Sequence, residues 1–191
     1  LNNSHKDLVL KACKQNKKIL CEKPLGLNLE EVKEINESFK NKKGQFFEAI
    51  AYRAHPQIFY LKKILDNKEI GDILKISSSF GFKLRNRNKD SRLFNKELGG
   101  GSILDLGCYP ISFFNLFKKE KNKMVILKKE KEICETNVDI DGAISIKIDD
   151  KVFANARVSF KEKLPNNCII DCEKGRITVS DPWIPHEKSF I

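Results

Sequence analysis

A charged pair followed by a proline ends the first apolar run of the sequence, in the order Glu22, Lys23 and Pro24. The run itself, residues 17–21, has the length and composition of a strand. A strand that stops there delivers two ionisable side chains to its carboxyl end, where open α/β sheets bind ligands. A lysine at such an edge can stay charged and polarise a carbonyl or alcohol oxygen. A surface lysine on a turn is the alternative interpretation of Lys23.

A glycine-rich stretch further along the chain brings an acid and a phenol onto one helix face. Residues 98–114 read LGGGSILDLGCYPISFF, and the spacing of Asp105 and Tyr109 places both on the same side of a helix. Such a pair can exchange protons with a substrate. Two simpler interpretations stay open: Ser102 can cap the helix with Asp105 favouring its start, and Tyr109 can be a half-buried aromatic with a satisfied hydroxyl. Pro110 predicts that the helix bends or starts again there.

The elements that must hold these residues fall into two groups. The first group predicts a helix over 4–16, a strand over 17–21, a helix over 28–44 and a strand over 45–52. Asn28 followed by Glu31 has the spacing of a capping box, and Gly44 marks the end of that helix. This alternation is typical of a parallel sheet with crossover helices.

The second group begins with a helix after Pro56 and then changes to a strand-rich pattern. Strands are predicted over 72–84, 123–129, 142–148, 151–160, 167–172 and 175–180. One helix, Ser102 to Phe117, is inserted among them. The pattern indicates a mostly antiparallel sheet, with the boundary between the two groups at residues 53–71.

The composition argues against several other functions. The net charge is +10, but lysine far outnumbers arginine and no basic stripe alternates with stacking aromatics, so no nucleic-acid partner is expected. The six cysteines form no C-x-x-C pair, which leaves metal sites unsupported. Cys168 and Cys172 are expected to be buried thiols of a cytoplasmic protein. No run of about 18 apolar residues predicts a membrane span.

Three stretches occur in an order that resembles one enzyme family. They are ILCEKPLG at 19–26, EAIAYRAHP at 48–56 and RLFNKELGGGSILDLGCYPI at 92–111. Together they resemble the glucose-fructose oxidoreductase / inositol dehydrogenase (Gfo/Idh/MocA) family, and most closely its branch of D-xylose and dihydrodiol dehydrogenases. The resemblance extends from Asn2 and His5 to the DPW sequence at 181–183.

The resemblance implies a fold class and a reaction. It implies an α/β protein in which residues 1–52 are the C-terminal portion of an NAD(P)-binding Rossmann domain with a parallel sheet. Residues 53–191 are then an α+β substrate and oligomerisation domain with a mostly antiparallel open sheet, truncated at its C-terminus. The implied reaction transfers a hydride between NAD or NADP and a sugar- or polyol-like alcohol or carbonyl. A homo-oligomer formed through the open sheet is also implied.

The same resemblance assigns roles at the strand end and on the helix. It places Lys23 beside the nicotinamide and the reacting oxygen, and Glu22 and Pro24 at the cofactor; the Lys23–Pro24 bond is often cis in relatives. Asp105 matches the family's acid near the substrate. Tyr109 stands where many relatives carry a histidine and is the implied acid/base, with a pKa that the nearby lysine should lower. The implied catalytic residues are therefore Lys23, Asp105 and Tyr109.

Three further residues match positions near the family's substrate. Arg53 and His55 match a Tyr-Arg-x-His-Pro segment, for which cleft lining and structural packing are both open interpretations. Arg92 matches the arginine before the family's glycine run, and substrate binding is the expected role. The other basic residues of 83–92 can meet an anionic substrate or the cofactor phosphates, but a solvated loop is the favoured interpretation.

The sequence also departs from the family pattern. It contains no G-x-G-x-x-G, the loop that grips the cofactor phosphates. It begins where the last third of the cofactor domain is expected and stops before the family's final strands. We therefore expect a fragment of a longer oxidoreductase that binds NAD(P) poorly by itself. The choice between NAD and NADP, the particular sugar or polyol, and the oligomeric state are not determined by the sequence.

Three rival functions stay open at this point. The chain can be a non-catalytic sensor of a dinucleotide or sugar with the same fold, a basic nucleic-acid binder, or an inactive truncated remnant. The presence of Lys23, Asp105 and Tyr109 together argues against the sensor, since a pure binding module needs no proton donor.

Overall fold

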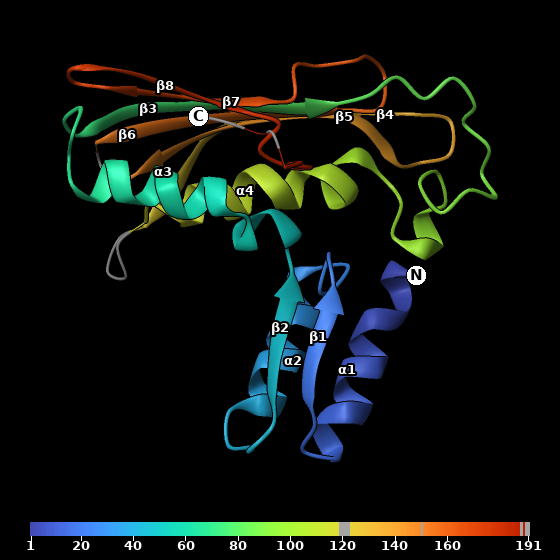
Figure 1. Ribbon diagram of the computed structural model, residues 1–191. Helices are drawn as coiled ribbons and strands as arrows, with labels where there is room; N and C mark the ends of the chain where they lie inside the picture. The colour runs from blue at the N-terminus through green and yellow to red at the C-terminus, as the bar shows by residue number, and fades with distance from the viewer. Residues whose placement is uncertain (119–122, 150, 188, 190–191) are drawn as a thin grey trace.

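The chain forms two units, each built on its own sheet (Figure 1). The computed structural model describes residues 1–118, 123–149, 151–187 and 189 of the 191-residue sequence. A two-stranded sheet belongs to the N-terminal unit, and a six-stranded sheet belongs to the second unit. Helices lie against one face of the six-stranded sheet, between it and the N-terminal unit (Figure 1).

The N-terminal unit has the predicted alternation of helices and strands. Its elements are α1 (His5–Lys14), β1 (Lys18–Glu22), α2 (Leu29–Phe39) and β2 (Gln45–Ala49). The two strands pair in parallel, from Lys18 with Gln45 to Glu22 with Ala49, so the parallel sheet is confirmed. Both strands point toward the second unit (Figure 1), and the parallel pairing aligns their carboxyl ends at that edge.

A small apolar core fixes α1 and α2 on one face of this sheet. The buried side chains come from both helices, from β1 and from the following turn: Val9, Cys13, Cys21, Leu25, Ile35 and Phe39. Leu20 and Phe47 alternate with the inward positions of β1 and β2, and both are exposed on the opposite face. The sheet is therefore covered on one side only among the described residues.

The second unit contains every strand that the sequence predicts. The strands are β3 (Ile73–Gly81), β4 (Met124–Ile133), β5 (Asp139–Ile148), β6 (Val152–Ser159), β7 (Asn167–Cys172) and β8 (Gly175–Ser180). Their order in the sheet is β4-β5-β6-β3-β7-β8, and all neighbours are antiparallel except β3 with β6. The mostly antiparallel sheet is confirmed.

Helices α3 (Pro56–Asp66) and α4 (Cys108–Asn115) cover one face of this sheet (Figure 1). The core beneath them is rich in aromatic side chains; Trp183 is buried among Tyr52 and Phe113 and donates its Nε1–H to the carbonyl of Ser79 at 2.9 Å. Strand residues that alternate with the buried ones point to the open face, and many are polar: Ser77, Ser79, Asn155, Asn167 and Thr178.

Two helix predictions were wrong in detail. α2 ends at Phe39 rather than near Gly44. The helix expected over 102–117 is not uniform, because residues Ile103–Gly107 form a wider π-helical turn before α4 begins. The irregularity therefore precedes Pro110, whose ring would collide with the carbonyl four residues earlier in a regular α-helix.

No helix among the described residues has both the length and the apolar character needed to cross a membrane.

Candidate active site

Lys23 lies at the carboxyl end of β1, immediately after the last residue that pairs with β2. The Lys23–Pro24 peptide bond is cis, as the resemblance implied. Pro24 is buried, whereas Glu22 is exposed. The strand thus ends by turning the lysine side chain toward the second unit.

Three hydrogen bonds, two of them from residues distant in the sequence, hold the turn that follows Lys23. His5 donates its Nδ1–H to the carbonyl of Pro24 at 2.7 Å, and the Leu25 N–H donates to a carboxylate oxygen of Glu48 at 2.8 Å. The Leu27 N–H donates to Glu31 at 2.8 Å. The Asn28 cap on the Glu31 N–H is confirmed, but Glu31 holds Leu27 instead of closing the box on Asn28. Only tertiary structure shows Glu48 as an anchor of this turn.

The ammonium of Lys23 contacts the predicted acid from the second unit. Its Nζ donates to the backbone carbonyl of Asp105 at 2.6 Å and lies 3.2 Å from the carboxylate Oδ1. The same Nζ lies 5.0 Å from the centre of the Tyr109 ring. The Lys23 and Asp105 side chains are only 15% and 9% exposed. The three residues predicted to be catalytic are therefore brought together at the junction of the two units.

Arg92 joins the same cluster through Asp105. Its Nη1 donates to Asp105 Oδ1 at 3.1 Å, and its side chain is 48% exposed. Two cations thus share one carboxylate. Such a site favours a developing negative charge on a bound oxygen. The simpler interpretation was half right: Asp105 does lie in the first turn of the helical segment, but Ser102 makes no side-chain cap bond there.

The Tyr109 hydroxyl has a raised pKa, contrary to the prediction that Lys23 would lower it. Burial raises the pKa of this phenol, and the opposing effect of the nearby Lys23 charge is smaller. Aromatic neighbours supply the burial: the Phe80 ring lies at 5.5 Å and the Tyr52 ring at 6.2 Å from the Tyr109 ring. Tyr109 is consequently protonated at neutral pH and can donate a proton. Burial also raises the pKa of the neighbouring Cys108 thiol, to about 12, so this thiol is no nucleophile.

Arg53 and His55 occupy positions outside this cluster. Arg53 is exposed on a short 3₁₀ turn, Ala51–Ala54. His55 caps α3, because its Nδ1 accepts the N–H of Gln57 at 3.2 Å. Neither residue has a hydrogen bond or ion pair to Lys23, Asp105 or Tyr109 in the part of the chain that is described. Their predicted roles at the substrate stay predictions.

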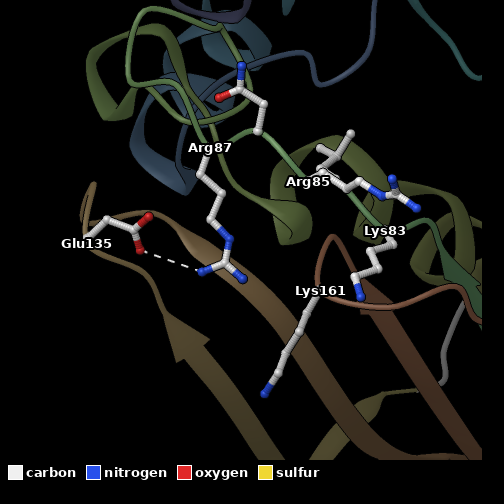
Figure 2. A pocket seen from close by; sticks show the side chains of 7 residues that line it. Lys83, Arg85, Arg87, Glu135 and Lys161 are labelled. Atoms are coloured by element: carbon white, nitrogen blue, oxygen red, sulfur yellow. Dashed lines mark ion pairs between the residues drawn. The ribbon is translucent and has the colours of Figure 1, made fainter.

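Three of the basic residues before Arg92, namely Lys83, Arg85 and Arg87, line a separate depression of about 690 Å³. Figure 2 shows Lys83, Arg85 and Arg87 on one loop, with Lys161 below them and Glu135 opposite Arg87. Arg87 forms an ion pair with Glu135 at 3.6 Å, and Lys161 pairs with Glu132 at 2.8 Å. The acids therefore neutralise part of this charge, and the catalytic cluster does not line the depression.

A mostly apolar pocket of about 610 Å³ lies beside Pro24 and the helical segment, but Lys23, Asp105, Tyr109 and Arg92 do not line it. Pro24 follows Lys23, and Gly107 and Cys108 lie between Asp105 and Tyr109 in the sequence. The remaining wall comes from the helical segment and from β4, β5 and β6: Ile103, Leu104, Pro110, Ile111, Lys129, Glu130, Lys131, Gly142, Ala143, Ile144, Ala156 and Val158.

The residues present fit the redox end of a nicotinamide cofactor. Lys23 ends a strand at the aligned carboxyl edge of a parallel sheet, the edge where such folds bind dinucleotides. Lys23, with Glu22 and Pro24 on either side, would hold that end near Asp105 and Tyr109. The sequence holds no G-x-G-x-x-G loop for the cofactor phosphates.

Two protein families match the sequence, one on each unit. The family described as an oxidoreductase family with an NAD-binding Rossmann fold matches residues 1–50. The GFO/IDH/MocA C-terminal domain matches residues 58–178 and by itself covers more than half of the chain.

Curated relatives are similar along nearly the whole chain. The trans-1,2-dihydrobenzene-1,2-diol dehydrogenase of Xenopus tropicalis is 34% identical over 183 residues, which are 95% of this chain and 54% of that protein. The enzyme of the same name from Mus musculus is 30% identical over 187 residues, or 96% of this chain and 54% of that protein. The chain thus spans about half the length of the curated relatives that it matches.

Solved structures share the fold at lower identity. An aldose-aldose oxidoreductase from Caulobacter crescentus, complexed with glycerol, matches with a TM-score of 0.86 at 16% identity, covering 98% of this chain and 56% of that one. A 3-ketoreductase from Actinomadura kijaniata, in complex with NADP and TDP-benzene, matches with a TM-score of 0.85 at 21% identity, covering 96% and 56%. At these identities the likeness shows the fold alone.

Proposed function

Because this chain belongs to the GFO/IDH/MocA oxidoreductase family, we propose that the protein is an NAD(P)-dependent dehydrogenase. It interconverts an alcohol and a carbonyl on a sugar-like or cyclic diol substrate. One observation carries the proposal: Lys23 of one unit contacts Asp105 and the Tyr109 ring of the other. A cation, a carboxylate and a protonated phenol are thereby gathered where a parallel sheet ends.

Lys23 and Tyr109 act on the substrate oxygen in this proposal. A lysine ammonium has three N–H donors, and two of them point at the carbonyl and carboxylate of Asp105. The third is available to polarise the oxygen. Tyr109, whose pKa is raised by burial, donates its proton to that oxygen during reduction and takes one back during oxidation. A nicotinamide cofactor, when bound, supplies or accepts the hydride.

Asp105 and Arg92 hold the donors in place. Asp105 orients the Lys23 ammonium through two acceptors, so the lysine needs little reorganisation when substrate arrives. Arg92 bonds Asp105 at 3.1 Å and is half-exposed, so it can also reach a substrate hydroxyl on its open side. Asp105 is near the reacting atoms without itself transferring the proton.

The substrate class is proposed from the named relatives of this chain. The curated relatives are named as dehydrogenases of a dihydrobenzene diol, and one structural neighbour as an aldose-aldose oxidoreductase. The diol dehydrogenases of Xenopus tropicalis and Mus musculus are 34% and 30% identical to this chain, whereas the aldose-aldose oxidoreductase is 16% identical. A cyclic diol is therefore the first substrate to test.

Further parts of the proposal concern the whole protein. The domain boundary falls between residues 52 and 53, with a portion of the Rossmann domain before it and a substrate domain after it. A homo-oligomer forms through the open face of the six-stranded sheet, which the helices leave uncovered (Figure 1). A cytoplasmic location suits the six cysteines, all of which are free thiols.

The test uses the complete gene product and follows formation of reduced cofactor by absorbance. NAD⁺ and NADP⁺ are each offered with cyclic diols, inositols and aldoses. Lys23→Ala and Tyr109→Phe are compared with the wild type, and each should lower kcat about 100-fold or more, as expected for loss of a positioned donor. Lys6→Ala, a surface lysine on α1 paired with Glu34, serves as the control and should retain full activity.

Two results would contradict the proposal. Unchanged turnover in both Lys23→Ala and Tyr109→Phe would remove these residues from the reaction. Dinucleotide binding without turnover on any of the substrates would favour a sensor of the same fold.

A further inference from the structure

We propose that Asp139 is a positioning residue, whose carboxylate fixes the backbone turn that presents Asp105 to Lys23. Asp139 is the first residue of β5 and lies 36 residues beyond the helical segment that it contacts. The expected effect of Asp139 on kcat rests on the proposed dehydrogenase function. Its expected effect on the exposure of Lys23 can be measured without turnover.

One carboxylate contacts three consecutive residues at the start of the helical segment. Its Oδ2 accepts the hydroxyl of Ser102 at 2.7 Å and the N–H of Ile103 at 2.6 Å. Its Oδ1 lies where only a glycine fits: a Cβ on Gly101 would stand 2.5 Å from this oxygen, and Gly101 has a φ of +115°. The glycine run therefore allows the backbone to close on Asp139.

The constraint passes directly to Asp105. Ile103 begins the π-helical turn that contains Asp105, and the Asp105 N–H donates to the Gly101 carbonyl at 3.1 Å. The Ile103 side chain also rests on Gly142 of β5, where an added Cβ would meet it at 2.7 Å. β5 thus supports the turn at two points, Asp139 and Gly142, and both oppose a shift of Asp105 away from Lys23.

Charge adds to this geometric effect. The π turn and α4 together give a helical segment from Ile103 to Asn115, and its first N–H groups carry a partial positive charge. Ser102 does not cap this end with its own hydroxyl, which instead donates to Asp139. The Asp139 carboxylate on β5 therefore caps this helical segment and links its first turn to the sheet.

The test compares Asp139→Ala with Asp139→Asn, which keeps an acceptor oxygen, and with the control Asp141→Asn. Asp141 lies two residues along the same strand and pairs with Arg157 at 2.8 Å. The complete protein is treated briefly with acetic anhydride, and acetylation of Lys23 is measured by mass spectrometry. Asp139→Ala should raise the Lys23 rate about fivefold or more, the factor expected for one lost hydrogen bond. Asp139→Asn should restore most of the protection, and Asp141→Asn should match the wild type.

If Asp139 only stabilises the fold, the result should differ. Asp139→Ala would then have a lower melting temperature, but Lys23 in the folded protein would be acetylated at the wild-type rate. That result would overturn the proposal. If Asp139→Ala does not fold, Ser102→Ala removes one of the two bonds to the carboxylate and carries the same readout. A Ser102→Ala protein with wild-type acetylation of Lys23 would likewise overturn it.

The kinetic arm separates this inference from the proposed function. In an active dehydrogenase, Asp139→Ala should lower kcat by about 10- to 100-fold, as expected when a catalytic group is displaced, with dinucleotide affinity unchanged. Equal losses in kcat and dinucleotide affinity would overturn the positioning role. A wild-type protein without turnover would refute the proposed function, while the acetylation rates would still decide the role of Asp139.

Discussion

The ion pair between Lys23 and Asp105 should couple the two units measurably. A double-mutant cycle with Lys23→Met and Asp105→Asn isolates the side-chain interaction, because the Asp105 carbonyl remains as an acceptor for Lys23 in the Asp105→Asn protein. The free energy of unfolding of the wild type, both single variants and the double variant is measured by urea denaturation with circular dichroism. All four measurements use the complete gene product.

The expected magnitude follows from distance and burial. At 3.2 Å, an effective dielectric constant of about 20 gives an attraction of about 5 kcal/mol. Desolvation of two side chains that are 15% and 9% exposed offsets much of this attraction. Arg92 also shares the carboxylate, so part of its charge is compensated when Lys23 is removed. We expect a net coupling of about 1.5–3 kcal/mol, the range of hydrogen bonds to charged groups.

An ion pair on the surface with the same distance between its charged atoms offers a control. Lys6 and Glu34 lie at the same distance of 3.2 Å, but their side chains are 28% and 53% exposed. The corresponding cycle with Lys6→Met and Glu34→Gln should give a clearly smaller coupling, which added salt abolishes. If the Lys23 cycle gives no more coupling than the surface cycle, the contact between the two units does not persist in solution, and the reasoning about the site fails with it.

Three further predictions follow from the same region. Gly101→Ala should destabilise the protein by about 1–3 kcal/mol, because a φ of +115° and the nearby Asp139 carboxylate both oppose a side chain. Gly107→Ala should be tolerated, because its Cβ would meet nothing closer than 3.6 Å. The free energy of unfolding of both variants is measured by urea denaturation. The rate of carbonyl reduction should fall only at a higher pH than an ordinary tyrosine would give, because Tyr109 must be protonated and burial raises its pKa; a pH–rate profile checks this, and Tyr109→Phe should lack that fall. Cys108, with a pKa raised to about 12, should react with iodoacetamide at pH 8 at least about tenfold more slowly in the folded than in the unfolded protein, as mass spectrometry can show.

Much of the scaffold could be predicted because its signals are local. Each strand of the second unit is a short run of β-branched and apolar residues, and each was expected within a few positions of its observed bounds. Lys23 was expected at a strand end because the apolar run stops there, and β1 does end at Glu22. These features depend on residues within a few positions of one another, which a single sequence shows.

The supports of the site could not be predicted in the same way. Glu48 holds the turn after Lys23 from the neighbouring strand, and Asp139 holds the start of the helical segment across 36 residues of sequence. Both look like ordinary surface acids at the start or end of a strand. The π-helical turn at Ile103–Gly107 likewise depends on contacts with β5, which the local pattern does not contain.

The pKa of Tyr109 shows why the chemical role of a residue needs the tertiary structure. The family resemblance implied a lysine near this phenol and so a lowered pKa, but aromatic rings pack against Tyr109 and its burial raises the pKa. On the proposed mechanism this reversal changes the resting state of the site. Lys23 offers its remaining N–H and Tyr109 offers its O–H, so two donors meet one substrate oxygen. A carbonyl oxygen has two lone pairs to accept them, whereas an alcohol must lose its own proton first, so the site at neutral pH is better prepared for carbonyl reduction than for alcohol oxidation.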